Sequence, residues 1–221
     1  MLEDGSEVFA DKVISNLNPK LLFKKLVDRD DVNQEYRRKI LNYKCGSGTF
    51  RMNVALSELP DFNCLPGKEI SEHHKSGIVI APSLTYMDQA FTDAKQYGWS
   101  KNPIVEMLIP STVDSTLAPD GKHVASLFCQ QFAPTLPDDR CWHNEKDNAA
   151  NTIIETVNRF APNFKDSILG MSILSPLDLE EKLGLIGGDI MHGVMSLDQM
   201  WAARPVSVSY THLTLPTNGC V

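Results

Sequence analysis

The residues from 184 to 205 combine types and spacings that suit contact with a flat, largely apolar ligand. Gly187 and Gly188 allow the backbone to adopt positive φ or to approach a planar group closely, which any side chain would hinder. His192 follows inside an apolar stretch, where a neutral imidazole could face a flavin or a substrate. A core histidine hydrogen-bonded to backbone is an equal alternative for His192, and a tight turn before a surface helix is the alternative for the whole segment.

Two polar residues of the same segment, Asp189 and Arg204, each have two possible roles. Asp189 either accepts a hydrogen bond from a cofactor hydroxyl or caps the turn, and the cap is favoured. Arg204 either neutralises a phosphate or pairs with Asp198, and the pair is favoured. Ser196 predicts the N-cap of a short helix that Pro205 ends.

Two other groups of residues have the types, but not the spacing, of a reactive site. His73 and His74 are adjacent, and no second ligand pair at helical spacing accompanies them, so a solvated loop is favoured over a metal site. Ser111, Asp114 and His123 are the residue types of a hydrolytic triad, but no glycine-flanked nucleophile turn surrounds the serine. We expect turn formers there rather than a hydrolase.

Aromatic residues could line an apolar substrate cavity, although ordinary core is the default at their spacings. The candidates are Tyr86, Phe91, Phe128, Phe132 and Trp142.

Composition excludes several classes of protein. The chain has 221 residues, 42% of them hydrophobic, which is enough for a substantial core. A net charge of −7 argues against nucleic-acid binding, which usually requires a clustered basic face. The 5 cysteines form no CxxC pair, which favours a reducing compartment. No run of about 18 apolar residues and no export signal is present, so we predict a cytoplasmic protein, or a mitochondrial one in a eukaryote, with peripheral membrane contact left open.

Hydrophobic periodicity predicts an α+β fold with a mixed sheet. Helices are expected at 19–27, 34–43, 84–97, 144–161 and 176–183, and strands at 7–10, 12–16, 49–56, 77–81, 104–109 and 124–130. Asp120 and Gly121 form the turn between the last two strands. The helix at 84–97 should bury one apolar stripe, formed by Leu84, Met87, Phe91, Ala94 and Tyr97.

Several segments resemble one family of flavoproteins. They are the opening LEDGSEVFADKVISN, CGSGTFRMNVALSELPDF at 45–62, IVEMLIPSTVDSTLAPDGKHVASLFCQ at 104–130, and GLIGGDIMHGVMSLDQMWAARP at 184–205. The chain is similar over about residues 2–206 to the phytoene-dehydrogenase-like, pyridine nucleotide-disulphide oxidoreductase domain-containing FAD-dependent oxidoreductases. The resemblance implies FAD as cofactor and an apolar small-molecule substrate that gives up a hydride to the flavin. An amine oxidase is a variant, which would need an aromatic cage near the flavin.

The resemblance also implies a division of the chain. Residues 1–44 would be a segment returning to an FAD-binding domain of partly Rossmann-like fold, with linker helices. Residues 45–183 would be the substrate domain, and 184–206 a second return toward the flavin. Ser15 and Asn16 then join Gly187, Gly188 and His192 as the residues expected near the cofactor. No catalytic residue is assigned, and the oligomeric state is not predicted.

The chain departs from the family pattern in two places. No Gly-x-Gly-x-x-Gly turn for the pyrophosphate is present, because Gly46 and Gly48 precede a strand instead of opening a helix. The likeness ends near Val206, and we interpret 207–221 as a non-native tail and Met1 as internal to a longer protein. The chain alone should therefore bind flavin weakly, and a non-catalytic binding or regulatory protein on the same scaffold is the alternative function.

Overall fold

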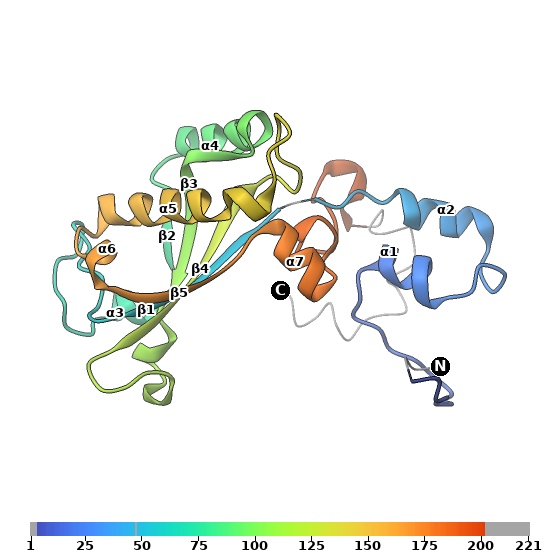
Figure 1. The fold of residues 1–221 in the computed structure, drawn as a ribbon, viewed down its shortest axis with the longest axis horizontal. Helices are drawn as coiled ribbons and strands as arrows, with labels where there is room; N and C mark the ends of the chain where they lie inside the picture. Colours follow the sequence, from blue (N-terminus) through green and yellow to red (C-terminus); the bar gives the residue numbers. More distant parts are fainter. Residues whose placement is uncertain (1–3, 47, 202–221) are drawn as a thin grey trace. The chain divides into compact units, whose positions relative to one another are not determined.

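The computed structural model describes residues 4–46 and 48–201 (Figure 1). Lys44–Met195 form one compact unit, and the described residues on either side belong to a second. The second unit contains α1 (Pro19–Leu21), the π-helical turn η1 (Leu22–Leu26), α2 (Gln34–Asn42) and the 3-10 turn η5 (Leu197–Gln199). The larger unit contains β1 (Phe50–Leu56), α3 (Glu72–Lys75), β2 (Ile78–Ile80), α4 (Leu84–Tyr97), β3 (Trp99–Leu108), η2 (Pro110–Thr112), η3 (Ser115–Leu117), β4 (His123–Phe132), α5 (Trp142–Phe160), α6 (Phe164–Ser167), β5 (Ile168–Leu174), α7 (Pro176–Leu183) and η4 (Ile186–Gly188).

A five-stranded sheet in the order β2-β3-β4-β1-β5 is the frame of the larger unit. All of its pairings are antiparallel, which makes it more regular than the mixed sheet expected from the sequence. The α+β class is confirmed. So are the expected strands at 49–56, 77–81, 104–109 and 124–130, within a few residues at their ends.

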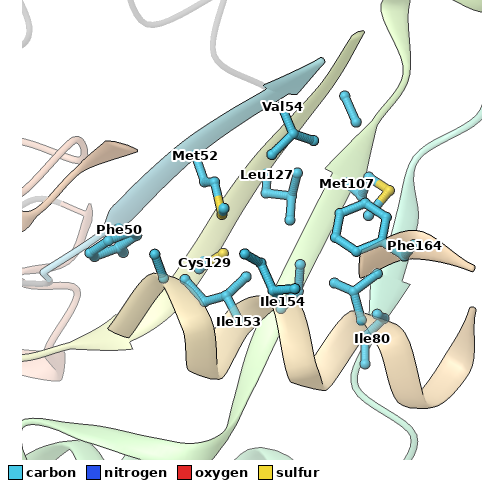
Figure 2. Packing of buried hydrophobic residues seen from close by; sticks show 14 of the residues in the cluster. Phe50, Met52, Val54, Ile80, Met107, Leu127, Cys129, Ile153, Ile154 and Phe164 are labelled. Carbon is cyan, nitrogen blue, oxygen red and sulfur yellow. The ribbon is translucent and has the colours of Figure 1, made fainter. Parts of the chain in front are cut away.

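One face of the sheet carries the hydrophobic core. Alternate residues of β1 are buried, from Phe50 to Leu56, and alternate residues of β4 and β3 join them. Helix α5 packs its Ile153 and Ile154 onto this face (Figure 2), and its Val157 belongs to the same cluster. At about 25 cal/mol for each Å² of apolar surface removed from water, this cluster is the main source of the unit's stability.

Helix ends follow the sequence closely. Ser83 accepts a hydrogen bond from the Tyr86 amide at the start of α4, and Gly98 ends that helix with φ of 94°. Ser175 and Asp178 form a reciprocal capping box at the start of α7. These boundaries confirm the helices predicted at 84–97 and 176–183.

The residues that α4 buries differ from those predicted. Four of the five residues in its expected buried stripe are exposed, with 85% of Leu84 and 55% of Tyr97 accessible, whereas Ala94 of the stripe is buried together with Ala90, which was not in it. The short alanine side chains face inward and the larger apolar residues point outward. The stripe therefore had the right spacing for a helix, but of its residues only Ala94 is buried.

The structure of the amino-terminal segment also differs from the prediction. Residues 7–10 and 12–16 form no strand, because no described segment pairs with them. Phe9 and Val13 are 87% and 86% exposed. The helices that follow are present, and Phe23 of η1 packs edge-on against Tyr36 of α2 with ring centroids 5.4 Å apart.

Other differences are smaller. Strand β5 and the short helix α3 were not predicted. Ser196 makes no cap bond, and η5 is a single turn rather than the longer helix expected. No helix among the described residues is long and apolar enough to cross a membrane. Arg204, Pro205 and the predicted tail at 207–221 lie outside the described residues.

Candidate functional site

The face of the sheet turned away from α5 carries a row of unlike side chains. Arg51 stands between the fully buried Phe50 and Met52, so it projects to this second face. The strand register places Phe128 beside Arg51 and Glu106 beside Phe128, from three neighbouring strands. A cation, an aromatic ring and a carboxylate thus lie in one line across the sheet.

Two adjoining cavities form a groove over this face, which we call the open-face groove. One has a volume of about 330 Å³ and is lined by Arg51, Glu106 and apolar residues of β2 and β3. The other, of about 260 Å³, is lined by Phe91 of α4 and by residues of β4 and of the chain from 190 to 195. Phe128, Ile190 and Met191 line both cavities, so the two are continuous. An apolar ligand can therefore extend from the β1 side toward α4.

The glycine segment predicted as the site forms one wall of this groove through Ile190 and Met191. Gly187 and Gly188 both have positive φ, 67° and 61°, as the sequence predicted. A Cβ on Gly188 would lie 2.5 Å from Cα of Pro176, and one on Gly187 would lie 3.1 Å from Cα of Gly46. Other parts of the same chain lie close to both glycines. Packing within the chain therefore explains the absence of a side chain at Gly187 and Gly188 without a ligand.

Hydrogen bonds join this wall to the chain that leads into β1. The buried Asp189 accepts from the amides of Gly46 and Met191, at 2.9 and 3.0 Å, so its carboxylate fixes the turn as favoured from the sequence. The Thr49 amide donates to the Gly188 carbonyl at 3.3 Å, and the Val194 amide donates to Lys44 at 2.9 Å. The wall is therefore tied to the sheet at several points.

His192 directly follows Met191 in the chain, but its side chain lines neither cavity; its φ of 57° is an uncommon conformation for a residue with a side chain. Its Nδ1 is buried and has no hydrogen-bond partner among the described residues. Its amide donates to the Asp189 carbonyl at 3.1 Å. The role of His192, whether beside a flavin or as a core histidine hydrogen-bonded to backbone, stays a prediction. An imidazole nitrogen without a partner is a group that a ligand could satisfy.

The two remaining predicted site residues lie in the smaller unit. Ser15 accepts a hydrogen bond from the Leu17 amide at 3.3 Å, and Asn16 is exposed. Both sit in extended chain that forms no strand. Their role beside a cofactor stays a prediction.

The solvated loop expected around His73 and His74 is wrong. His74 is fully buried in α3, where its Nε2 lies 3.0 Å from the Pro60 carbonyl and the Ser71 amide donates to its Nδ1. Burial lowers the pKa of His73, whose ring lies 3.9 Å from that of His74. Over the residues that the structure covers, no group of three His, Cys, Asp or Glu could hold a metal ion.

The hydrolytic arrangement is only half assembled. Ser111 Oγ lies 3.4 Å from His123 Nδ1, and burial lowers the pKa of His123. Asp114 instead accepts from the amide and hydroxyl of Thr116, at 2.9 and 2.6 Å. The Ser111 hydroxyl also accepts from the Val124 amide at 3.0 Å, as a turn former does.

The aromatic candidates divide between groove and core. Phe91 and Phe128 line the groove, while Phe132 and Trp142 belong to the core cluster. Tyr86 donates its hydroxyl to the Pro103 carbonyl at 3.0 Å.

Sequence reasoning missed Arg51, Glu106 and Gln130 in the groove. The strict alternation from Phe50 to Leu56 already placed Arg51 opposite the core. A charged residue between the two apolar residues Phe50 and Met52 was the feature that could have identified it.

The chain is similar to part of two longer proteins. No family model matches it. It is 38% identical over 211 residues to pyridine nucleotide-disulfide oxidoreductase domain-containing protein 2 of Rattus norvegicus, covering 93% of this chain and 36% of that protein. The protein of the same name from Mus musculus is 38% identical over 210 residues, with the same coverage. The chain thus spans about a third of the length of the curated relatives it matches.

Proposed function

Because the chain is homologous to pyridine nucleotide-disulfide oxidoreductase domain-containing proteins, we propose that it is the substrate-binding part of an FAD-dependent oxidoreductase. The reaction is hydride transfer from an apolar small-molecule substrate to the flavin, as in a phytoene desaturase-like dehydrogenase. The observation that carries the proposal is the apolar groove whose wall is the segment that the sequence assigned to the flavin side.

The groove supports an apolar substrate. Its lining is dominated by Phe91, Phe128, Ile190, Met191 and Met195, which offer an oily surface to a ligand. Small-molecule sites are typically concave and apolar with a few placed polar groups. Arg51, Glu106 and Gln130 are such groups here.

The described residues fit one part of FAD better than another. The buried, unpartnered Nδ1 of His192 and the apolar wall beside it suit the edge of a flavin ring. The sequence holds no Gly-x-Gly-x-x-Gly turn for the pyrophosphate, so that half of the cofactor would need residues from elsewhere. Gly187 and Gly188 have only backbone to contribute, and Gly46 and Pro176 lie close against them on the side where a Cβ would be.

The roles that we assign to this chain are binding and positioning. When bound, FAD would supply the acceptor of the hydride. The apolar wall would exclude water from the reacting carbon, and the row of polar residues would fix the orientation of the substrate. His192 would hydrogen-bond on the cofactor side, and Ser15 and Asn16 are proposed as further contacts there.

A flavin spectrum of the complete protein tests the proposal. We expect protein expressed from the whole gene to retain the visible absorbance of oxidised flavin after desalting. His192→Ala should lower the flavin content, whereas His143→Ala, at a side chain 62% exposed, should not. A preparation that lacks flavin and also rejects added FAD would overturn the enzyme assignment.

One observation favours the second candidate function, a non-catalytic binding or regulatory protein on the same scaffold. The apolar stripe of α4 is exposed, with Leu84 at 85%, Met87 at 42% and Phe91 at 44%. Such a face suits a partner protein. The flavin measurement separates the two functions, because a binding protein would carry no flavin and would still present this face.

A further inference from the structure

Arg51 is an unusual cation for an apolar groove. It is the second residue of β1 and projects to the open-face groove, and only part of its side chain is exposed. Its Nη2 donates to the Ser126 hydroxyl at 3.0 Å, and its guanidinium carbon lies 5.6 Å from the centre of the Phe128 ring. No carboxylate lies within ion-pair distance among the described residues. A guanidinium has five N–H donors, so most of its capacity is unused.

The nearest acid in the row does not serve Arg51. Glu106 stands on the far side of Phe128, two strands away, and accepts a hydrogen bond from the side-chain Nε2 of Gln130 at 3.2 Å. Two strand spacings correspond to about 10 Å. The groove is therefore polarised, with a cation at its β1 side and an anion toward β3.

Apolar residues continue the groove away from Arg51. Ile190 and Met191 connect the cavity that contains Arg51 to the cavity that reaches Phe91. A ligand with its head at Arg51 would lay an aliphatic body along this path. A planar guanidinium favours a carboxylate, which it can bind through two parallel hydrogen bonds.

We propose that the open-face groove binds an amphipathic carboxylate, an aliphatic molecule with one carboxylate head held by Arg51. That this carboxylate is the substrate rests on the proposed function. Its binding does not, because binding needs no flavin. Glu106 acts as a specificity residue, since its charge repels a carboxylate from the wrong end of the groove. Arg51 contacts the head and is not assigned a part in hydride transfer.

Calorimetric titration of the chain with dodecanoate, below its micelle concentration, tests the proposal. Dodecanol and dodecyltrimethylammonium have the same chain with a neutral and a cationic head. We expect dodecanoate to bind most tightly and Arg51→Gln to weaken it about ten- to hundredfold, the usual value of a charged hydrogen bond, without changing dodecanol binding. Glu106→Gln should strengthen dodecanoate binding about twofold.

Lys122→Gln is the matched control. Lys122 is exposed in the turn between β3 and β4, lines neither cavity, and its replacement removes the same charge. Arg51→Lys separates charge from geometry and should recover part of the affinity. Melting curves of each variant show that it is folded.

Equal binding of dodecanoate and dodecanol, or equal losses in Arg51→Gln and Lys122→Gln, would overturn the proposal. The flavin spectrum is a separate test. Flavin without an effect of Arg51 removes this inference alone, and an effect of Arg51 without flavin removes the enzyme assignment alone.

Discussion

Replacing Gly188 by alanine distinguishes two reasons for the glycine pair in the candidate site. If Gly188 is required only for close approach to a flavin, the flavin-free chain should lose little stability beyond the cost of positive φ. If it is required for packing, the loss should be larger, because the new Cβ would lie 2.5 Å from Cα and 2.8 Å from the carbonyl oxygen of Pro176.

The magnitudes come from matched glycines. Gly121 also has positive φ, 70°, but nothing lies within 4 Å of its Cβ position, so Gly121→Ala should cost about 1 kcal/mol from the left-handed backbone. Gly170 has neither constraint, and Gly170→Ala should stabilise the chain by about 0.5 kcal/mol. Gly188→Ala adds the steric cost of overpacking and should lose about 2–4 kcal/mol.

Urea unfolding followed by the fluorescence of Trp99 and Trp142 measures these differences. Both tryptophans pack in the larger unit, with ring centroids 5.4 Å apart. The dependence on urea should stay constant, so the midpoint reports stability. Equal losses in Gly188→Ala and Gly121→Ala would refute the packing argument and restore close approach to a ligand as the reason for Gly188.

Three further outcomes follow from the same structure. Burial raises the pKa of Asp178, but hydrogen bonds from Ser175 and Lys182 outweigh it and lower the pKa to about 2, so Asp178 contributes stability above its unfolded value of 3.8 that is lost toward pH 2. Asp178→Asn should therefore destabilise by roughly 2 kcal/mol at pH 6 and by almost nothing at pH 2, and a constant difference across acid titrations would contradict this. Ile153→Ala, at a fully buried site on α5, should cost about 2–5 kcal/mol in urea unfolding, whereas Leu84→Ala, 85% exposed, should stay within about 0.5. Burial raises the pKa of the Cys129 thiol, so mass spectrometry after native thiol labelling should find the exposed Cys64 and Cys141 modified first; early modification of Cys129 would show that the core opens.

Helices and strands could be predicted from the sequence more accurately than the tertiary packing around them. Alternation identified β1 because one face of that strand is buried without exception, and Ser83, Ser175 and Gly184 act locally to cap helices. These features depend on residues close in sequence. Packing does not, and this is why four of the five residues in the predicted stripe of α4 are exposed.

Strand formation failed for a related reason. Residues 7–16 have strand-like composition, but a strand is stabilised by a neighbour, and no described segment supplies one. Strand β5 was missed because a short apolar run such as ILGMSIL does not by itself distinguish a strand from a buried helix. Its pairing with β1, far away in sequence, decides the outcome.

The candidate site illustrates the same limit. The glycine segment was found from its composition, since positive φ at Gly187 and Gly188 has a clear sequence signature. Arg51 was not found, because its importance depends on Phe128 and Ser126, which only the sheet brings beside it. A constellation assembled across strands requires the register, which one sequence does not provide.

One face of the sheet carries the hydrophobic core and the other carries the open-face groove, so the groove can be altered without altering the core. The core cluster lies on the α5 face and does not include Phe128, Arg51 or Glu106. Substitutions at these three positions should therefore leave the main source of stability intact. Arg51, the second residue of β1, is charged although an apolar residue there could pack against Phe128. Its guanidinium contacts Phe128 and Ser126, and the anionic ligand proposed for the groove would occupy its remaining donors.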